Sequence, residues 1–231
     1  AHSSIREGVA GEFEWERILA GKRWFHFSGT APALGGNVVA VLEEALTVAK
    51  RLGVTVSCDC NYRSKLWTVE EAGRVLGNLL ARVDVFVGGV EDAGKLFGVY
   101  APEALAGDEN GCAAFAAQRL RERFGFSWVG MTLRGGASAS VNRYAGMVCC
   151  DAGCFFSRDY EIVMVDRVGA GDAFTAGLVH GIMVGMPPAR VAEFAAAAAC
   201  LKHTIPGDFN LATVREIEQA LEGGQAGRVQ R

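Results

Sequence analysis

The chain has 231 residues, of which 50% are hydrophobic and 21% charged, and its formal net charge is −3. These values exclude a disordered chain and a strongly basic binder of nucleic acid or membrane surfaces, and the length suffices for one large α/β domain. No apolar run reaches the roughly 18 residues of a membrane span. The N-terminus carries no signal-peptide core, so we expect a cytoplasmic protein.

Strand and helix patterns alternate along the first half of the chain. Short apolar, β-branched runs predict strands at 24–27, 54–57 and 85–87. Apolar residues at helical spacing predict a helix over 13–20, one capped by Asn37 with its apolar face over 38–48, one opened by a Thr68–Glu71 capping box, and two more over 91–97 and 113–124.

The second half continues the alternation. The pattern predicts strands at 128–133 and 162–165, and a hairpin over 138–150 that turns near Asn142 and Arg143. Helices are expected from about 170 to 184, over 188–203, and from a capping box formed by Thr213 and Glu216.

This order of elements predicts a three-layer α/β/α sandwich with a mostly parallel central sheet. We expect one domain over residues 1–222, followed by a frayed polar tail over 223–231. Ligands of such sheets bind outside the carboxyl ends of the strands. The candidate site segments are therefore the strand exits 28–29, 59–63, 88–92, 132–136 and 166–172.

Cysteine usage agrees with a reducing compartment. The chain has seven cysteines, an odd number, and no CxxC pair. Clusters at 58–60 and 149–154 combine cysteine with aspartate, but no histidine lies near either, as a zinc site would favour. We expect small buried cysteines on strands, with metal binding as the weaker alternative.

A glycine-rich segment over 168–174 follows a strand and opens a helix. Gly169 and Gly171 permit a sharp turn, and the amides of Gly169, Ala170 and Gly171 lie at the positive end of the helix dipole, where they form an anion hole. Asp172 follows directly and is suited to take a proton from a hydroxyl while the amides stabilise a phosphoryl group. The alternative is a plain glycine turn with an acidic helix cap. The Walker motif is absent, and GxGxxG fails because Phe174 stands at the third glycine.

Residues 166–177 resemble the C-terminal signature of the ribokinase-like (PfkB) carbohydrate kinases. Residues 59–67, 129–134 and 202–210 resemble the 2-keto-3-deoxygluconate kinases of that family, and the resemblance runs from about residue 5 to 221. It implies a ribokinase-like fold with a chain that begins partway through it, without the N-terminal strands, the glycine-rich sugar-binding segment and the β-lid.

The resemblance also implies roles for individual residues. Asp172 corresponds to the catalytic base and Gly169, Ala170 and Gly171 to the anion hole. Substrate contacts are implied for Arg63, Asp172 and Asp208, and nucleotide contacts for Asn61, Arg63, Thr132, Leu133, Arg134 and Gly136. Alternatives remain open: Arg63 as a solvated surface residue, residues 135–136 as a plain turn, and Asp208 as a turn former.

The implied cofactors are ATP and Mg²⁺, with a monovalent cation near Asp166. Asp92 is the candidate that supports Mg²⁺ through water. It stands where the family has glutamate, and Gly89 stands where the family has asparagine, which weakens this metal assignment. The implied partners are a sugar acid and ATP, without nucleic acid or membrane, and a homo-oligomer stays open.

The leading hypothesis is ATP-dependent phosphorylation of a sugar acid, 2-keto-3-deoxygluconate to its 6-phosphate. One alternative is a kinase for another sugar such as fructose or ribose. A second is a truncated, non-catalytic remnant that binds nucleotide. A third is a nicotinamide-dependent oxidoreductase, against which the failed GxGxxG pattern speaks.

Overall fold

The computed structural model describes residues 4–136 and 141–222, which form a mixed α/β fold, as predicted. The chain divides into two compact units, Ala1–Val129 and Gly130–Arg231. The single domain expected over residues 1–222 stays a prediction, and the tail 223–231 lies outside the described residues. Within the described ranges, no helix has the length and apolar character needed to cross a membrane.

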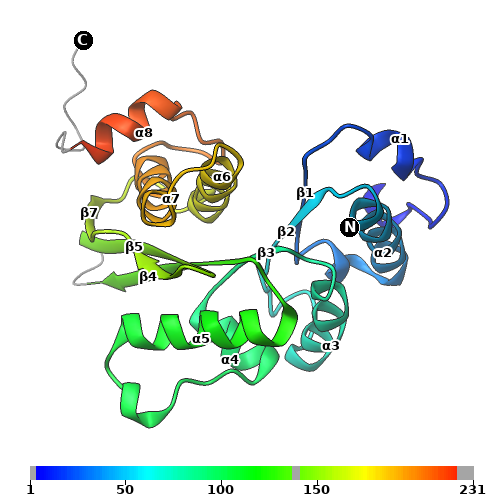
Figure 1. The fold of residues 1–231 in the computed structure, drawn as a ribbon, viewed down its shortest axis with the longest axis horizontal. Helices are drawn as coiled ribbons and strands as arrows, with labels where there is room; N and C mark the ends of the chain where they lie inside the picture. The colour runs from blue at the N-terminus through cyan, green and yellow to red at the C-terminus, as the bar shows by residue number, and fades with distance from the viewer. Residues whose placement is uncertain (1–3, 137–140, 223–231) are drawn as a thin grey trace. The chain divides into compact units, whose positions relative to one another are not determined.

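The first unit alternates strands and helices in the order expected from its sequence (Figure 1). Its strands are β1 (Trp24–Ser28), β2 (Thr55–Asp59) and β3 (Val85–Gly88). Its α-helices are α1 (Trp15–Leu19), α2 (Gly36–Arg51), α3 (Val69–Leu80), α4 (Val90–Phe97) and α5 (Glu109–Phe124). Short 3₁₀ turns occupy Ser4–Arg6, Pro32–Leu34 and Glu103–Leu105.

The three strands of this unit are parallel, and their carboxyl ends meet at one edge. Ser28 pairs with Asp59 in the β1–β2 register, and Asp59 pairs with Val87 in the β2–β3 register. The exits come very close together, since a Cβ on Gly29 would lie 2.1 Å from the carbonyl oxygen of Cys60. Glycine is therefore required at position 29, and the polar residues that follow each strand lie at the same edge.

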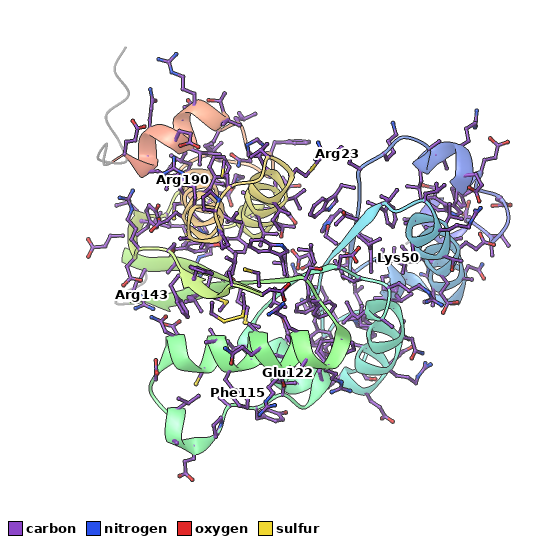
Figure 2. All side chains as sticks on the ribbon, in the orientation of Figure 1. Arg23, Lys50, Phe115, Glu122, Arg143 and Arg190 are labelled. Atoms are coloured by element: carbon purple, nitrogen blue, oxygen red, sulfur yellow. A yellow bond between two sulfur atoms is a disulfide. The ribbon has the colours of Figure 1, made fainter. Side chains whose placement is uncertain are left out.

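Aromatic packing and an ion pair fix the rest of this unit. Phe86 on β3 stacks on Phe126 with ring centroids 5.3 Å apart, which forms part of the buried core. At the amino ends of the strands, Lys50, labelled in Figure 2, lies 2.6 Å from Asp84, whose other carboxylate oxygen accepts from the amide of Val56. The polar exits are thus at the opposite end from this structural ion pair.

The second unit contains most of β4 (Trp128–Gly136) and the strands β5 (Val141–Cys150), β6 (Gly153–Phe156) and β7 (Tyr160–Val163). Its helices are α6 (Ala170–Met183), α7 (Pro188–His203) and α8 (Val214–Leu221). Strand β5 is antiparallel to both β6 and β7.

The predicted turn near Asn142 and Arg143 is wrong. Both residues lie within β5, where they pair with Ile162 and Glu161 of β7. The chain turns at 151–152 instead, where Gly153 supplies a φ of +117° that other residues rarely adopt. Long-range strand pairing thus overrides the local turn preference of asparagine. Residues 138–140 of the predicted hairpin lie outside the described residues.

Helices α6 and α7 lie side by side, and α7 packs on β5 (Figure 1). A Cβ on Gly177 of α6 would lie 2.9 Å from the Cα of Ala195, so small residues set the close approach of the two helices. Helix α8 packs on α7 and is joined to it by an ion pair between Arg190 and Glu218; Arg190 is labelled in Figure 2.

The three helix caps predicted from the sequence differ in outcome. The Thr213–Glu216 capping box is confirmed, whereas at Thr68 only the bond from the Glu71 amide to the threonine hydroxyl is formed. The predicted Asn37 cap is wrong, because α2 begins at Gly36 and its first turn closes on the carbonyl of Gly35.

One pair of cysteines departs from the expectation of reduced thiols. Cys149 and Cys154 face each other across the β5–β6 ladder and are joined by a disulfide. The other five cysteines take no part in a disulfide, and four of them are buried, as predicted. Among the described residues, no group of three potential metal ligands exists, so the metal interpretation of the cysteine clusters finds no support.

Candidate active site

The residues singled out in the sequence fall into two groups, one in each compact unit. The first unit holds Asn61, Arg63 and Asp92, next to the exits of β2 and β3. The second unit holds the glycine-rich segment with Asp172, together with Asp208.

The glycine-rich segment opens α6 as predicted. Gly169 is the N-cap residue with a φ of +77°, no side chain caps the helix, and the first helical hydrogen bond runs from the Ala173 amide to the Gly169 carbonyl at 2.9 Å. In the described part of the chain, the amides of Ala170 and Gly171 have no hydrogen-bond partner. A Cβ on Gly171 would meet nothing within 4 Å. Unpaired amides beside open space at a helix N-terminus are suited to bind an anion.

Asp172 is exposed in the first turn of α6. Its carboxylate makes no hydrogen bond or ion pair with any residue that the structure describes. The alternative interpretation, in which Asp172 caps the helix, therefore lacks the hydrogen bond that a cap requires. The carboxylate is available to accept a proton from a substrate hydroxyl.

Asp166 has a structural role in the loop before α6. Its Oδ1 accepts from the amide of Val168 at 3.0 Å, and its Oδ2 accepts from the amide of Gly207 at 2.8 Å. These two hydrogen bonds, supported by the Arg167 amide and the charge of Lys202, hold the pKa of the Asp166 carboxyl below its usual range. Asp166 thereby ties the loop 166–169 to the segment after α7.

Lys202, in the last turn of α7, is a residue that sequence reasoning missed. Its side chain is fully buried (0% exposed), and its Nζ donates to the carbonyl of Ile205 at 3.0 Å and to that of Gly207 at 2.7 Å. The sequence signal is weak, because a lysine near a helix C-terminus is favoured by the helix dipole alone.

His203, next along α7, is also buried. Its Nδ1 lies 3.0 Å from the carbonyl oxygen of Asp166, and its own carbonyl accepts from the amides of Val165 and Asp166. The residue thereby holds the chain that leads into the loop 166–169, which is named the anion-hole loop below.

Asp208 lies beside the anion-hole loop through its backbone. A Cβ on Gly169 would lie 2.2 Å from the Asp208 carbonyl oxygen, so the two segments are in direct contact. Gly207 has a φ of +86°, which supports the turn interpretation of this segment. The side chain of Asp208 is exposed and has no partner among the described residues, so a ligand can reach it.

Asn61 has an unusual backbone conformation at the exit of β2. It is the one non-glycine residue with a positive φ (+39°) in the described ranges. Its amide donates to Asp59 Oδ1 at 3.0 Å, and its Nδ2 donates to Ser28 Oγ at 3.1 Å, which stabilises this conformation. Such strain is typical of functional sites, and it places the asparagine at the sheet edge where ligands of α/β proteins bind.

Arg63 is exposed, and the only hydrogen bond recorded for its guanidinium in the described residues is a long one of 3.5 Å to the carbonyl of Tyr62. Tyr62 is itself held, since its hydroxyl donates to the Trp67 carbonyl at 3.2 Å. The backbone before Arg63 is therefore fixed while the guanidinium stays available to bind a carboxylate or a phosphate.

Asp92 lies in the first turn of α4, three residues after the N-cap residue Gly89. Partial burial raises the pKa of its carboxyl, and a hydrogen bond from the Gly89 amide opposes this shift. The side chain therefore has a structural partner as well as the oxygens that a water-mediated Mg²⁺ contact needs. One carboxylate of this kind suits Mg²⁺ that is carried mainly by nucleotide phosphates and water.

The residues of β4 that are predicted to contact the nucleotide differ in their burial. Thr132 is half-buried, whereas Leu133 is buried, so Leu133 would meet a ligand only through its backbone. The backbone of Arg134 and Gly136 continues β4, and the position of the Arg134 side chain lies outside what the structure describes.

A shallow groove of about 460 Å³ lies in the first unit beside α5, lined in part by Phe115, Arg119, Glu122 and Arg123. Phe115 and Glu122 are labelled in Figure 2. Arg119 already pairs with Glu122 at 2.7 Å, and Arg123 donates to the Phe97 carbonyl at 2.5 Å. The groove contains none of the predicted site residues, and its arginines have partners within the protein.

Comparison with known proteins identifies a family. Residues 6–212 match the pfkB family of carbohydrate kinases. The crystal structure of 2-dehydro-3-deoxygluconokinase from Thermotoga maritima is similar, with 47% identity and a TM-score of 0.90, over 96% of this chain and 67% of that one. A pfkB family carbohydrate kinase from Listeria grayi has 33% identity and a TM-score of 0.86, over 96% of this chain and 67% of that one.

Among curated proteins, 2-dehydro-3-deoxygalactonokinase from Haloferax volcanii is 33% identical over 203 residues, which are 88% of this chain and 58% of that protein. The 2-dehydro-3-deoxygluconokinase of Bacillus subtilis is 28% identical over 195 residues, 83% of this chain and 53% of its own length. The chain thus spans somewhat more than half the length of the curated relatives it matches.

Proposed function

Because this chain belongs to the pfkB family of carbohydrate kinases, we propose that it transfers the γ-phosphoryl group of ATP to the primary hydroxyl of a 2-keto-3-deoxy sugar acid. The observation that carries the proposal is the arrangement at α6: an exposed Asp172 without a structural partner, one residue after unpaired helix N-terminal amides. An acceptor for a proton beside donors for an anion is what phosphoryl transfer to an alcohol requires.

The reaction assigns one role to each group. The alcohol oxygen of the sugar acid attacks the γ-phosphorus and loses its proton to the Asp172 carboxylate. The bond between the γ-phosphorus and the oxygen bridging it to the β-phosphorus breaks, and ADP leaves. The amides of Gly169, Ala170 and Gly171 donate to the phosphoryl oxygens, whose charge is spread in the transition state, and so lower the barrier.

Substrate recognition is assigned to Arg63 and Asp208. The planar guanidinium of Arg63 suits bidentate binding of a carboxylate, which distinguishes a sugar acid from a neutral sugar. The exposed Asp208 carboxylate is suited to accept from sugar hydroxyls. The names of the similar proteins, 2-dehydro-3-deoxygluconokinase and 2-dehydro-3-deoxygalactonokinase, support a 2-keto-3-deoxy acid and leave both C4 epimers as candidates.

ATP and Mg²⁺ are the cofactors of this proposal. Asn61, Arg63, Thr132, Leu133, Arg134 and Gly136 are the proposed nucleotide contacts, and Asp92 is the proposed contact to metal-bound water. Mg²⁺ supplies charge neutralisation on the nucleotide phosphates when bound. Asn61 is held at the sheet edge by Ser28 and Asp59, and it can support this role without rearrangement.

The test is ADP release by this chain with a panel of acceptors: 2-keto-3-deoxygluconate, 2-keto-3-deoxygalactonate, 5-keto-2-deoxygluconate, fructose and ribose. We expect turnover with one or both 2-keto-3-deoxy acids and a mass increase of one phosphoryl group in the product. Phosphorylation of fructose or ribose without any reaction of the acids would overturn the substrate assignment.

A second candidate function is nucleotide binding without catalysis. Gly89 favours it, because the family has an asparagine there and glycine offers no side chain toward metal or phosphate. Titration calorimetry with ATP and Mg²⁺ separates the two candidates: binding of ATP without turnover of any acceptor supports the non-catalytic protein, and turnover rejects it.

A further inference from the structure

Lys202 carries a buried charge that the proposed reaction does not use directly. Its side chain is 0% exposed, and lysine is rarely buried completely because removing an ammonium from water is energetically unfavourable. The cost is offset by the carbonyls of Ile205 and Gly207 and by the negative charge of Asp166. A charge kept in such a position at this cost points to a role in the neighbouring site.

The contacts of Lys202 lead to the anion hole in two steps. Gly207 is held from both sides, since its carbonyl accepts from Lys202 Nζ at 2.7 Å and its amide donates to Asp166 Oδ2 at 2.8 Å. The carbonyl of the next residue, Asp208, is in direct contact with Gly169. The Lys202 side chain also reaches the loop itself, because its Cε lies 3.2 Å from where a Cβ on Gly169 would be.

We propose that Lys202 is a positioning residue whose ammonium is a fixed internal cation, which holds Asp208 and the anion-hole loop in place so that phosphoryl transfer needs no monovalent cation there. This inference rests on the proposed kinase function. It replaces the monovalent cation expected near Asp166 from the family resemblance.

The oxygen atoms around Asp166 that could ligate a monovalent cation already accept hydrogen bonds, so they do not fit a further cation. Both carboxylate oxygens of Asp166 accept from backbone amides, and the carbonyls of Ile205 and Gly207 accept from Lys202. A monovalent cation at these carbonyls would stand within a few ångströms of the ammonium and would be repelled by it. One positive charge is already present, and it is covalently attached.

The test compares the chain with Lys202→Ala, which leaves a cavity, and Lys202→Met, which keeps most of the volume but not the charge. Lys22→Ala removes an exposed charge elsewhere and is the control for general charge effects. Each protein is assayed for kcat, KM and ATP affinity in choline chloride, KCl, NH₄Cl and methylammonium chloride at one ionic strength, and its melting temperature is measured in the same salts.

We expect the kcat of the unmodified chain and of Lys22→Ala to differ by less than about twofold between choline chloride and KCl. In choline chloride, the kcat of both Lys202 variants should be lower than that of the unmodified chain by about tenfold or more. Ammonium or methylammonium should restore kcat in Lys202→Ala and not in Lys202→Met, whose thioether fills the cavity. A purely structural lysine would lower the melting temperature of both variants without this difference in kcat.

Two results would overturn the proposal: K⁺ stimulation of the unmodified chain by tenfold or more, or variants whose kcat equals that of the parent in choline. Should the unmodified chain turn over no acceptor, the kinase function itself fails. The internal cation is then judged by ATP affinity and melting temperature, which small ammonium ions should restore in Lys202→Ala alone; equal values in all salts for both variants would reject it.

Discussion

Asp166 and Lys202 hold the same residue from opposite sides: the Asp166 carboxylate accepts from the Gly207 amide at 2.8 Å, and the Lys202 ammonium donates to the Gly207 carbonyl at 2.7 Å. These two hydrogen bonds hold the segment after α7 in place beside the loop that opens α6. The amides proposed to bind the phosphoryl group are therefore preorganised by the side chains of Asp166 and Lys202.

Removing the charge of Asp166 should give a pH-dependent loss of stability. Its pKa in the folded protein lies below the ordinary value of 3.8, so the ionised carboxylate stabilises the fold above that pH and loses its contribution as the pH falls through the lowered pKa. Asp166→Asn should therefore have a lower free energy of unfolding than the parent protein, measured by urea denaturation at about pH 7. The gap between the two free energies of unfolding should narrow below about pH 4. Asp208→Asn, whose side chain has no partner among the described residues, is the control; a gap that stays constant with pH would contradict the assignment.

Gly169 and Gly171 should respond differently to the same substitution. Gly169→Ala introduces a Cβ at a φ of +77° and 2.2 Å from the Asp208 carbonyl, and should lower the free energy of unfolding by about 1–3 kcal/mol. Gly171→Ala meets nothing within 4 Å and should stabilise the helix by up to about 1 kcal/mol while its methyl group intrudes on the anion hole and lowers kcat. Thermal melts with ADP-release kinetics measure both, and a Gly171→Ala variant that retains full kcat would speak against this loop as the phosphate site.

Arg63 should contribute to substrate affinity rather than to folding. Because lysine cannot bind a carboxylate in the bidentate manner, Arg63→Lys should raise KM for the sugar acid by about tenfold with an unchanged melting temperature. Arg74→Lys on α3 is the matched exposed control. An unchanged KM in Arg63→Lys would place the carboxylate site elsewhere.

Sequence reasoning predicted the parts of the site that depend on local chain geometry. The turn that opens α6 could be predicted because Gly169, Gly171 and Asp172 lie close together in the sequence and the conformation of the turn follows from these residue types. The parallel strands β1–β3 and their shared edge followed from apolar runs alternating with helical patterns.

The parts that depend on packing between distant segments of the chain could not be predicted from the sequence. The burial of Lys202 results from the fold of the 205–208 segment around its side chain, which no local pattern of the alanine-rich α7 reveals. Strand β5 runs through Asn142 and Arg143 because β7 pairs with it, against their turn preference. The disulfide of Cys149 and Cys154 likewise depends on the register of β5 and β6.

The central claim, that Asp172 receives the proton of the substrate hydroxyl, is tested most directly by the kcat of Asp172→Asn. Asparagine keeps the shape and cannot accept the proton, so kcat should fall by about 10²–10⁴-fold while the affinity for ATP, measured by calorimetry, stays within about twofold. Glu70→Gln, at another exposed position in the first turn of a helix, α3, should leave both unchanged. An Asp172→Asn protein with the kcat of the parent would contradict the account.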